Sequence, residues 1–331
     1  MNYISVVIEM VEYKDILAAY ERVKGTVNKT PIMTSRTLNE LTNAKIYLKC
    51  ENFQRIGAFK MRGAYNTLSQ LTEEQRKKGV IAHSSGNHAQ AVALSAKLLN
   101  IKATIVMPNT SPQVKVNATR DTYGAEVVMC ENTIEARHST TQDLIDKHGY
   151  SLVHPYDNDN VIAGAGTAAH ELLNQVEGLD MVFGPVGGGG LISGTSIAVK
   201  GFNPNIKVYA VEPKNVDDAY RSIESGQIEK NETIKSIADG LLTNLSERTF
   251  IIIKKNVDKI ITVSEQEILD AMRFIWERMK IVVEPSGACS LAGVLSDQIP
   301  IENKKIGVII SGGNIDLNDF FNLIQNKIKR G

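Results

Sequence analysis

Residues 181–194 read Met-Val-Phe-Gly-Pro-Val-Gly-Gly-Gly-Gly-Leu-Ile-Ser-Gly. The apolar run 181–186 predicts a buried strand, and residues 191–194 can start a helix. Between them lie the four glycines Gly187, Gly188, Gly189 and Gly190. Such a loop presents backbone N–H groups at the positive end of a helix dipole, which favours a phosphate, although four glycines can also form a hinge. The terminal Lys-Ser/Thr of the nucleotide P-loop is missing, and so is a clean G-x-G-x-x-G followed by an acid about 20 residues on, so we expect a phosphorylated cofactor other than a dinucleotide.

The rest of the chain repeats the alternation of a short apolar run and a longer amphipathic stretch. Six further runs rich in Val and Ile predict strands, at residues 80–82, 103–107, 125–129, 208–211, 259–263 and 306–310. Residues 89–99 carry an apolar stripe at helical spacing, and Ser264 with Glu267 forms a capping-box signature before a helix containing Phe274 and Trp276. This alternation is typical of an α/β fold with open, mainly parallel sheets and helices on both faces.

Length and composition limit the class of protein. The chain has 331 residues, enough for roughly two domains, and 37 basic against 37 acidic side chains give a net charge of zero. A balanced charge argues against a nucleic-acid polymer as partner. Three cysteines without a C-x-x-C pair predict neither a disulfide framework nor a Cys-based zinc site, which fits a cytoplasmic location. No run approaches the roughly 18 apolar residues of a membrane span.

Three more motifs follow predicted strands or stand beside them. Residues 84–88 read Ser-Ser-Gly-Asn-His before the helix at 89–99, which suits a carboxylate but also an ordinary N-cap cluster. Lys60 stands between Phe59 and Met61, where desolvation could leave a nucleophilic amine; a solvated helix lysine is the alternative. Ser-Gly-Gly-Asn at 311–314 could be a binding loop or a plain strand-to-helix turn.

Taken together and in this order, the motifs resemble the fold-type II family of pyridoxal-phosphate enzymes, which contains serine racemases and serine/threonine dehydratases. The resemblance runs from about residue 30 to residue 317 and includes 51–54, 163–167 and 237–240. It implies a large cofactor-binding domain of residues 1–70 and 158–331 and a small substrate-binding domain of residues 71–157. It also implies a homodimer.

By this resemblance, pyridoxal 5′-phosphate is the cofactor and Lys60 its Schiff-base lysine. The glycines 187–190 would bind the phosphate, Phe59 would lie against the ring, Asn87 would contact the ring hydroxyl and Ser311 would hydrogen-bond the pyridine nitrogen. A serine at that place cannot hold the nitrogen protonated as an aspartate does. The resemblance therefore favours racemisation and β-elimination over extended carbanion chemistry.

The substrate is implied to be a small amino acid. Its carboxylate would meet Ser84, Asn87 and His88, with a structural role as the alternative for His88, and Ser85 would also contact the substrate. Ser85 resembles the serine that serine racemases carry at the matching place, where many threonine dehydratases have alanine. By this resemblance, Ser85 would serve as the acid/base on the face opposite Lys60. Arg137 and His154 match family positions near the substrate and could meet a second carboxylate, although a solvated arginine and a loop histidine are equally compatible with the sequence.

A divalent-cation site is implied in residues 212–218. Glu212, the carbonyl of Val216 and Asp218 would be ligands, and oxygen-only ligation suits Mg²⁺ or Ca²⁺. The alternative is an acidic cluster stabilised by a helix dipole without any metal. ATP as an effector is left open by the sequence.

These expectations combine into an enzyme that racemises serine and dehydrates serine or threonine, giving D-serine and pyruvate or 2-oxobutanoate with ammonia. The alternatives are a threo-3-hydroxyaspartate dehydratase or a dedicated catabolic threonine dehydratase. A regulator that binds a phosphate ligand without catalysis is the non-enzyme alternative, and Lys60 between two apolar residues argues against it.

Overall fold

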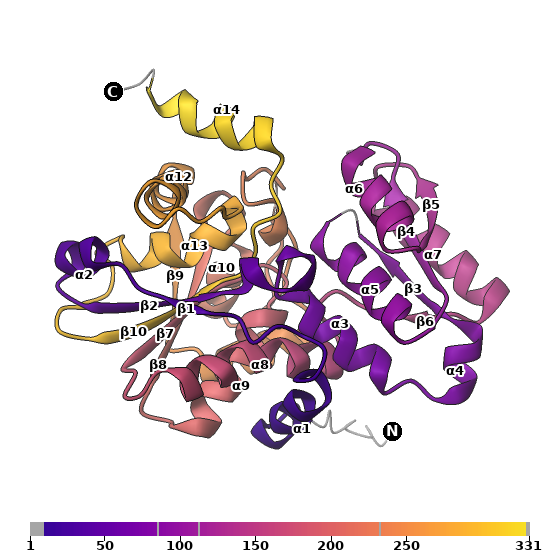
Figure 1. Ribbon diagram of the computed structural model, residues 1–331, viewed down its shortest axis with the longest axis horizontal. Coiled ribbons are helices and arrows are strands. Elements are labelled where there is room, and N and C mark those ends of the chain that lie inside the picture. The colour runs from indigo at the N-terminus through magenta and orange to yellow at the C-terminus, as the bar shows by residue number, and fades with distance from the viewer. Residues whose placement is uncertain (1–9, 85, 112, 232, 329–331) are drawn as a thin grey trace.

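The computed structural model describes residues 10–328 except 85, 112 and 232, and places them in two sheets with helices packed on both (Figure 1). The larger sheet has six strands in the order β1-β2-β10-β7-β8-β9, and the smaller has four in the order β5-β4-β3-β6. All neighbouring strands run parallel except β1 and β2. The predicted fold class is confirmed.

The larger sheet is buried on both faces. Its strands are β1 (Ile32–Met33), β2 (Lys45–Cys50), β7 (Met181–Pro185), β8 (Lys207–Pro213), β9 (Lys259–Val263) and β10 (Lys305–Ile310). Successive residues alternate between the two faces: Phe183 and Val308 enter one core, whereas their neighbours Val182 and Ile309 enter the other. Because every residue of such a strand is covered, the sequence reads as an unbroken apolar run.

Two helix layers cover this sheet. One core is closed by α2 (Arg36–Thr42), α12 (Glu265–Phe274), α13 (Pro285–Val294) and α14 (Leu317–Ile328). The other is closed by α1 (Tyr13–Val23), α8 (Asp159–Gln175), α9 (Gly190–Phe202), α10 (Asp218–Ser225) and α11 (Glu247–Asn256).

The smaller sheet lies beside the first, on the right in Figure 1. Its strands are β3 (Val80–His83), β4 (Ala103–Pro108), β5 (Glu126–Cys130) and β6 (Ser151–Leu152). Its helices are α3 (Lys60–Ser69), α4 (Glu73–Lys78), α5 (Asn87–Leu98), α6 (Gln113–Asn117) and α7 (Ile134–His148). All four strands fall inside the predicted small domain, and the domain boundaries themselves stay a prediction.

All seven strands expected from apolar runs are present, and three strands were missed. The missed strand β2 carries Lys45 and Lys49, which interrupt its apolar character, and β1 and β6 have only two residues each. The capping box of Ser264 and Glu267 is confirmed, but the α-helix behind it ends at Phe274, and Trp276 lies in a following π-helical turn, Ile275–Met279. In the described part of the chain, none of the helices combines the length and apolar character that a membrane crossing needs.

Candidate active site

The glycine loop and the Ser-Gly-Gly-Asn loop follow β7 and β10, neighbouring parallel strands of the larger sheet, so they lie at the same edge of that sheet. The Ser-Ser-Gly-Asn-His motif follows β3 of the smaller sheet, and hydrogen bonds of Asn87 join it to the larger one. Lys60, at the start of α3, is the central side chain. Its Nζ donates a 2.7 Å hydrogen bond to the carbonyl oxygen of Pro155, just beyond β6, and lies 5.2 Å from the centre of the Phe59 ring. The side chain keeps some exposed surface, but the amine lies deep, and desolvation lowers the pKa of Lys60 to about 8. The lowered pKa agrees with the predicted desolvation of this amine, and its role as the nucleophile stays a prediction.

The glycine loop follows β7 and leads into the first turn of α9, as predicted. Gly189 has a φ of 88°, in the left-handed region that glycine favours. A Cβ on Gly188 would lie 2.5 Å from ring carbons of Tyr156, and one on Gly190 would lie 2.8 Å from the Tyr156 Cβ. Tyr156 therefore forms one wall of the loop, a role that no sequence motif predicted.

The segment before Lys60 is fastened to the end of β10. Phe59 N donates a 3.0 Å hydrogen bond to the carbonyl of Ser311, and Ala58 forms an isolated antiparallel bridge with Gly312. The final Ser-Gly-Gly-Asn motif thus lies directly beside Lys60. Ser311 itself is buried.

The helix α5 begins at Asn87, in the middle of the Ser-Ser-Gly-Asn-His motif. Asn87 Nδ2 donates a 2.9 Å hydrogen bond to Oε1 of Glu284, the residue before α13, which the sequence analysis missed. The Ser84 hydroxyl oxygen accepts a 3.2 Å bond from Gly86 N within the motif. Ser85 lies outside the described residues, so its predicted role stays a prediction.

The His88 ring is fully buried and neutral. Desolvation, together with the Lys60 charge, lowers the pKa of His88 to about 3, and Nε2 lies 2.8 Å from the carbonyl of Val153. A carbonyl only accepts, so the neutral ring carries its proton on Nε2 and offers a lone pair at Nδ1, which is buried with no hydrogen-bond partner among the described residues. This geometry argues against His88 as a donor to a substrate carboxylate.

Four basic side chains gather beside His88. The ring centres of His83 and His138 are 5.1 Å apart, and those of His83 and His154 are 6.2 Å apart. Arg137, next to His138 on α7, has a buried Nε without a hydrogen-bond partner in the described part of the chain. Desolvation lowers the pKa of both His83 and His154 to about 4, so these two rings are neutral at neutral pH. His83 was missed, although it stands at the end of a predicted strand.

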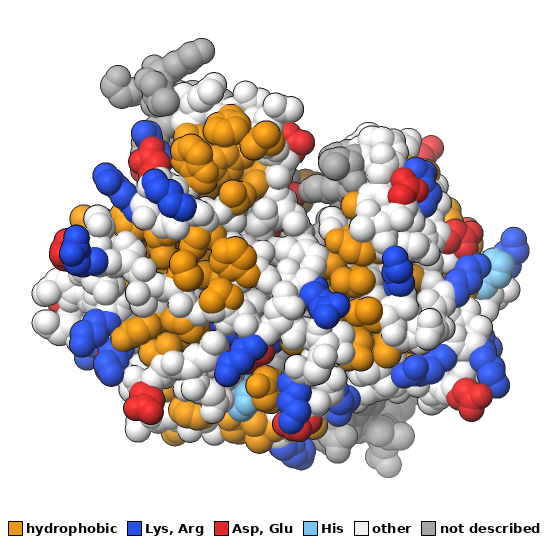
Figure 2. Space-filling view, in the orientation of Figure 1, with side chains coloured by type: hydrophobic (Ala, Val, Ile, Leu, Met, Phe, Trp, Pro, Cys, Tyr) orange, Lys and Arg blue, Asp and Glu red, His pale blue; other side chains and the backbone are white. Residues whose placement is uncertain are grey.

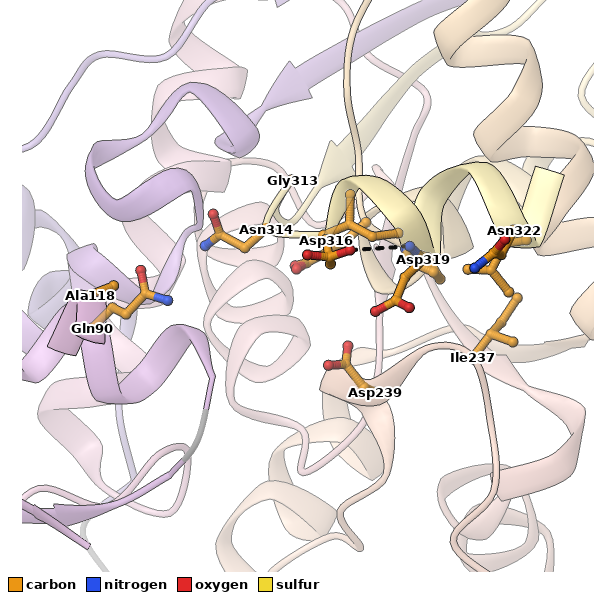
Figure 3. A pocket seen from close by; sticks show the side chains of 13 residues that line it. Gln90, Ala118, Ile237, Asp239, Gly313, Asn314, Asp316, Asp319 and Asn322 are labelled. Carbon is orange, nitrogen blue, oxygen red and sulfur yellow. Dashed lines mark hydrogen bonds between the residues drawn. The ribbon is translucent and has the colours of Figure 1, made fainter. Parts of the chain in front are cut away.

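A cavity of about 540 Å³ opens next to Asn87 and Glu284. Figure 3 shows Gln90 of α5 and Ala118 on one side, the start of α14 on the other, and Asn314 between them. Its lining includes four carboxylates, those of Asp239, Glu284, Asp316 and Asp319.

Behind Lys60, a fully buried ion network anchors α3. Arg62 Nε lies 2.7 Å from Glu51 Oε2, and its Nη1 lies 2.9 Å from Glu171 Oε1. Lys49 Nζ lies 2.6 Å from Oε2 of Glu171, so two buried cations pair with two buried carboxylates. Each charge is compensated, which a desolvated interior requires.

The predicted cation ligands lie at the end of β8 and the start of α10. Glu212 accepts from Ala219 N at 3.0 Å and Tyr220 N at 2.9 Å. Asp218 accepts from Asn231 Nδ2 at 2.6 Å and Leu245 N at 3.1 Å. Desolvation raises the pKa of Asp218 to about 6 and, with repulsion from Asp218, holds the pKa of Glu212 well above its usual value.

Each carboxylate oxygen of this pair keeps a second lone pair, so the donor set fits a hard cation without requiring one. Among the described residues, no group of three or more His, Cys, Asp and Glu side chains is arranged to hold a metal. The predicted set uses only two carboxylates with the Val216 carbonyl, and it stays a prediction.

Comparison with known proteins agrees with this geometry. A family model described as pyridoxal-phosphate dependent enzyme matches residues 23–312, so the chain belongs to that family. The chain is 50% identical to serine racemase from Dictyostelium discoideum, with 95% of this chain and 98% of that protein covered. It is 51% identical to L-threo-3-hydroxyaspartate ammonia-lyase from Saccharomyces cerevisiae, covering 95% and 97%. The structure of maize serine racemase superposes with a TM-score of 0.91 at 40% identity, covering 97% of this chain and 98% of that one.

The protein is thus a pyridoxal-phosphate-dependent enzyme whose relatives are racemases and ammonia-lyases of amino acids. The predicted family, cofactor and reaction class are confirmed.

Proposed function

We propose that this enzyme racemises serine and also eliminates water from serine and threonine, releasing ammonia. The observation that carries the proposal is the buried Lys60 amine. It is held 2.7 Å from the Pro155 carbonyl beside the glycine loop and Ser311, in a chain 50% identical to a serine racemase.

The residues present fit the cofactor. Tyr156 occupies the space where side chains at Gly188 and Gly190 would lie, so these positions require glycine. A loop without side chains at the start of α9 would offer its N–H groups to a phosphate. Bound pyridoxal phosphate supplies an electron sink that acidifies the α-hydrogen of an attached amino acid. The residues that would hold it are Phe59, Lys60, Asn87, Gly187, Gly188, Gly189, Gly190 and Ser311.

Lys60 supplies the base on one face. Because its pKa is lowered to about 8, Nζ exchanges a proton near neutral pH more readily than an ordinary lysine. The Pro155 carbonyl accepts from that amine and orients it. Ser311 would be a neutral partner that does not stabilise a positive ring nitrogen, which would favour racemisation and β-elimination.

Racemisation needs a second acid/base on the opposite face, because one amine cannot serve both. We assign this role to the Ser85 hydroxyl. Ser84 and Asn87, at the N-terminus of α5, would hold the substrate carboxylate through neutral donors and the helix dipole.

A second candidate substrate, 3-hydroxyaspartate, is favoured by the cluster of His83, Arg137, His138 and His154. The buried Nε of Arg137 has no hydrogen-bond partner among the described residues, and an unpaired buried donor costs stability. A bound anion could accept a hydrogen bond from it. The Lys60 charge contributes to the lowered pKa of His154, which indicates that the cluster lies near the reacting amine. The β-carboxylate of 3-hydroxyaspartate would supply the missing acceptor for Arg137.

Three finer features belong to the proposal. Mg²⁺ or Ca²⁺ at Glu212, Val216 and Asp218 would neutralise two buried carboxylates. A homodimer is supported by exposed apolar side chains at Phe53 (47%) and Leu317 (67%), and Figure 2 shows such side chains gathered over α14. The three cysteines are free thiols, which supports a cytoplasmic location. ATP as effector stays open.

The test is to measure D-serine and pyruvate formed in parallel from L-serine by the enzyme and by Ser85→Ala. We expect racemisation to fall about 10²- to 10⁴-fold while dehydration falls much less. An equal fall in both products would show that Ser85 is not the second acid/base, and absence of both products in the parent enzyme would overturn the serine assignment.

A further inference from the structure

The turn before Lys60 has an unusual backbone. Ile56 has φ 59° and ψ 8°, and Gly57 follows with φ 72°, so two successive residues are left-handed. Glycine adopts this region freely, but a β-branched residue there is strained. Such strain persists only where neighbouring groups hold it. Lys60, the first residue of α3, comes three residues after Gly57, so this turn helps to place the reacting amine.

One side chain holds both residues of the turn. Asn314 Nδ2 donates a 2.6 Å hydrogen bond to the carbonyl of Ile56. A Cβ on Gly57 would lie 2.5 Å from Asn314 Oδ1, so the amide packs where a larger residue would have its side chain. The backbone reinforces this, because Gly313 N donates to the Gly57 carbonyl at 2.9 Å.

The same amide nitrogen also bonds across to α5. Asn314 Nδ2 donates a 2.8 Å hydrogen bond to Asn87 Oδ1, and Asn87 Nδ2 in turn donates to Glu284 Oε1 at 2.9 Å. These two bonds fix which end of the Asn87 amide is oxygen and which is nitrogen. Figure 3 shows Asn314 on the loop before α14, directed toward the side of the cavity where Gln90 of α5 lies.

We infer that Asn314 is a positioning residue that holds the strained Lys60 turn and orients Asn87 through one amide, so that the two groups keep a fixed spacing. An –NH₂ group has two protons, and here each serves one of the two bonds. Shortening, reversing or removing this amide would release the turn and Asn87 together. The relevance of this spacing to catalysis rests on the proposed role of Lys60, but the coupling itself does not.

The test compares amide hydrogen exchange in the full-length, cofactor-free protein, followed by mass spectrometry of peptides covering 54–61 and 86–92. Asn314→Ala should raise exchange in both peptides at least tenfold. Asn314→Asp, which keeps the shape but has no N–H donors, should do the same and serves if the alanine variant does not fold. The control is Asn52→Ala, which removes a 3.2 Å bond to the Val282 carbonyl nearby and should leave both peptides unchanged.

A further variant separates strain from simple contact. Asparagine enters the left-handed region more readily than isoleucine, so in an Ile56→Asn background Asn314→Ala should raise exchange of 54–61 much less. With cofactor, Asn314→Ala should lower kcat more than it changes KM for serine. Unchanged exchange in either peptide, or an equal response to Asn52→Ala, would overturn the inference. Because exchange is measured without cofactor or substrate, an error in the proposed function leaves this result intact.

Discussion

The Nζ atom of Lys60 donates a hydrogen bond to the carbonyl oxygen of Pro155, 95 residues further along the chain. This bond joins the start of α3 to the segment that leaves the smaller sheet. The carbonyl accepts a hydrogen bond from the amine but carries no charge, so desolvation remains the main influence on the pKa of Lys60.

The first prediction concerns the pH dependence of Lys60. With its pKa lowered to about 8, the amine of the cofactor-free protein should react with added pyridoxal phosphate at a rate that rises through pH 7 and levels off above pH 9. At pH 7 the rate should be about one tenth of the plateau, whereas an ordinary lysine would show less than about one thousandth. Stopped-flow absorbance at several pH values measures this, and a midpoint near pH 10 would contradict it.

The sign of the stability effect follows from the same shift. The unfolded chain keeps the Lys60 proton up to a pKa of 10.5, whereas the folded chain releases it at about 8. Burial of the charged amine therefore costs stability below pH 8, and this cost is relieved as pH rises from 8 toward 10.5. Lys60→Met should remove this part of the pH dependence in cofactor-free denaturation experiments.

The second prediction concerns Gly188. A methyl group at this position would meet the Tyr156 ring at 2.5 Å, so Gly188→Ala must displace the ring or the loop. We expect pyridoxal phosphate to bind at least tenfold more weakly, as measured by fluorescence titration. Gly25→Ala is the matched control, because a Cβ there has no described atom within 4 Å. Unchanged affinity in Gly188→Ala would show that the loop does not hold the phosphate.

The third prediction tests the basic cluster. Arg137→Gln should lower kcat/KM for L-threo-3-hydroxyaspartate about 10- to 100-fold, because the substrate's second carboxylate loses its charged partner. L-serine, which has no second carboxylate, should be affected much less. Lys147→Gln, at the exposed end of the same helix α7, should leave both substrates unaffected. Equal losses for both substrates would mean that Arg137 acts on the fold or on the shared carboxylate.

The fourth prediction concerns the carboxylate pair. Chelation with EDTA should lower activity and reduce the melting temperature by a few degrees, and Mg²⁺ or Ca²⁺ should restore both through binding to the folded state. The double variant Glu212→Gln with Asp218→Asn keeps the shape and removes the charge. If it still responds to Mg²⁺ as the parent does, the cation binds elsewhere.

Much of this site could be predicted from sequence because its backbone donors lie at strand ends. The glycine loop and Ser311 directly follow strands of the larger sheet, and Asn87 begins the helix after a strand of the smaller sheet. Within each parallel sheet, such positions lie at the carboxyl ends of the strands, where ligands bind. Lys60 could be recognised as the candidate reactive lysine because it stands between two apolar residues and at the matching place in the order of motifs.

The residues that were missed act through contacts between distant segments. Tyr156 matters because its ring lies against Gly188, and Glu284 because its carboxylate reaches Asn87, 197 residues away. Arg62 carries no sequence motif that marks it, yet it is fully buried between Glu51 and Glu171. Periodicity along one segment carries no information about such pairings.

Lys60 is the lysine that we propose to carry the cofactor. This assignment is tested most directly by reducing the enzyme with borohydride after loading with pyridoxal phosphate, and by mapping the added mass to a peptide. The protein contains a natural comparison, since Lys49 is also buried but is paired with Glu171 at 2.6 Å. We expect Lys60 to carry the label and Lys49 not to, and we expect Lys60→Ala to abolish both labelling and turnover while the protein stays folded. Label on another lysine, or full turnover in Lys60→Ala, would contradict it.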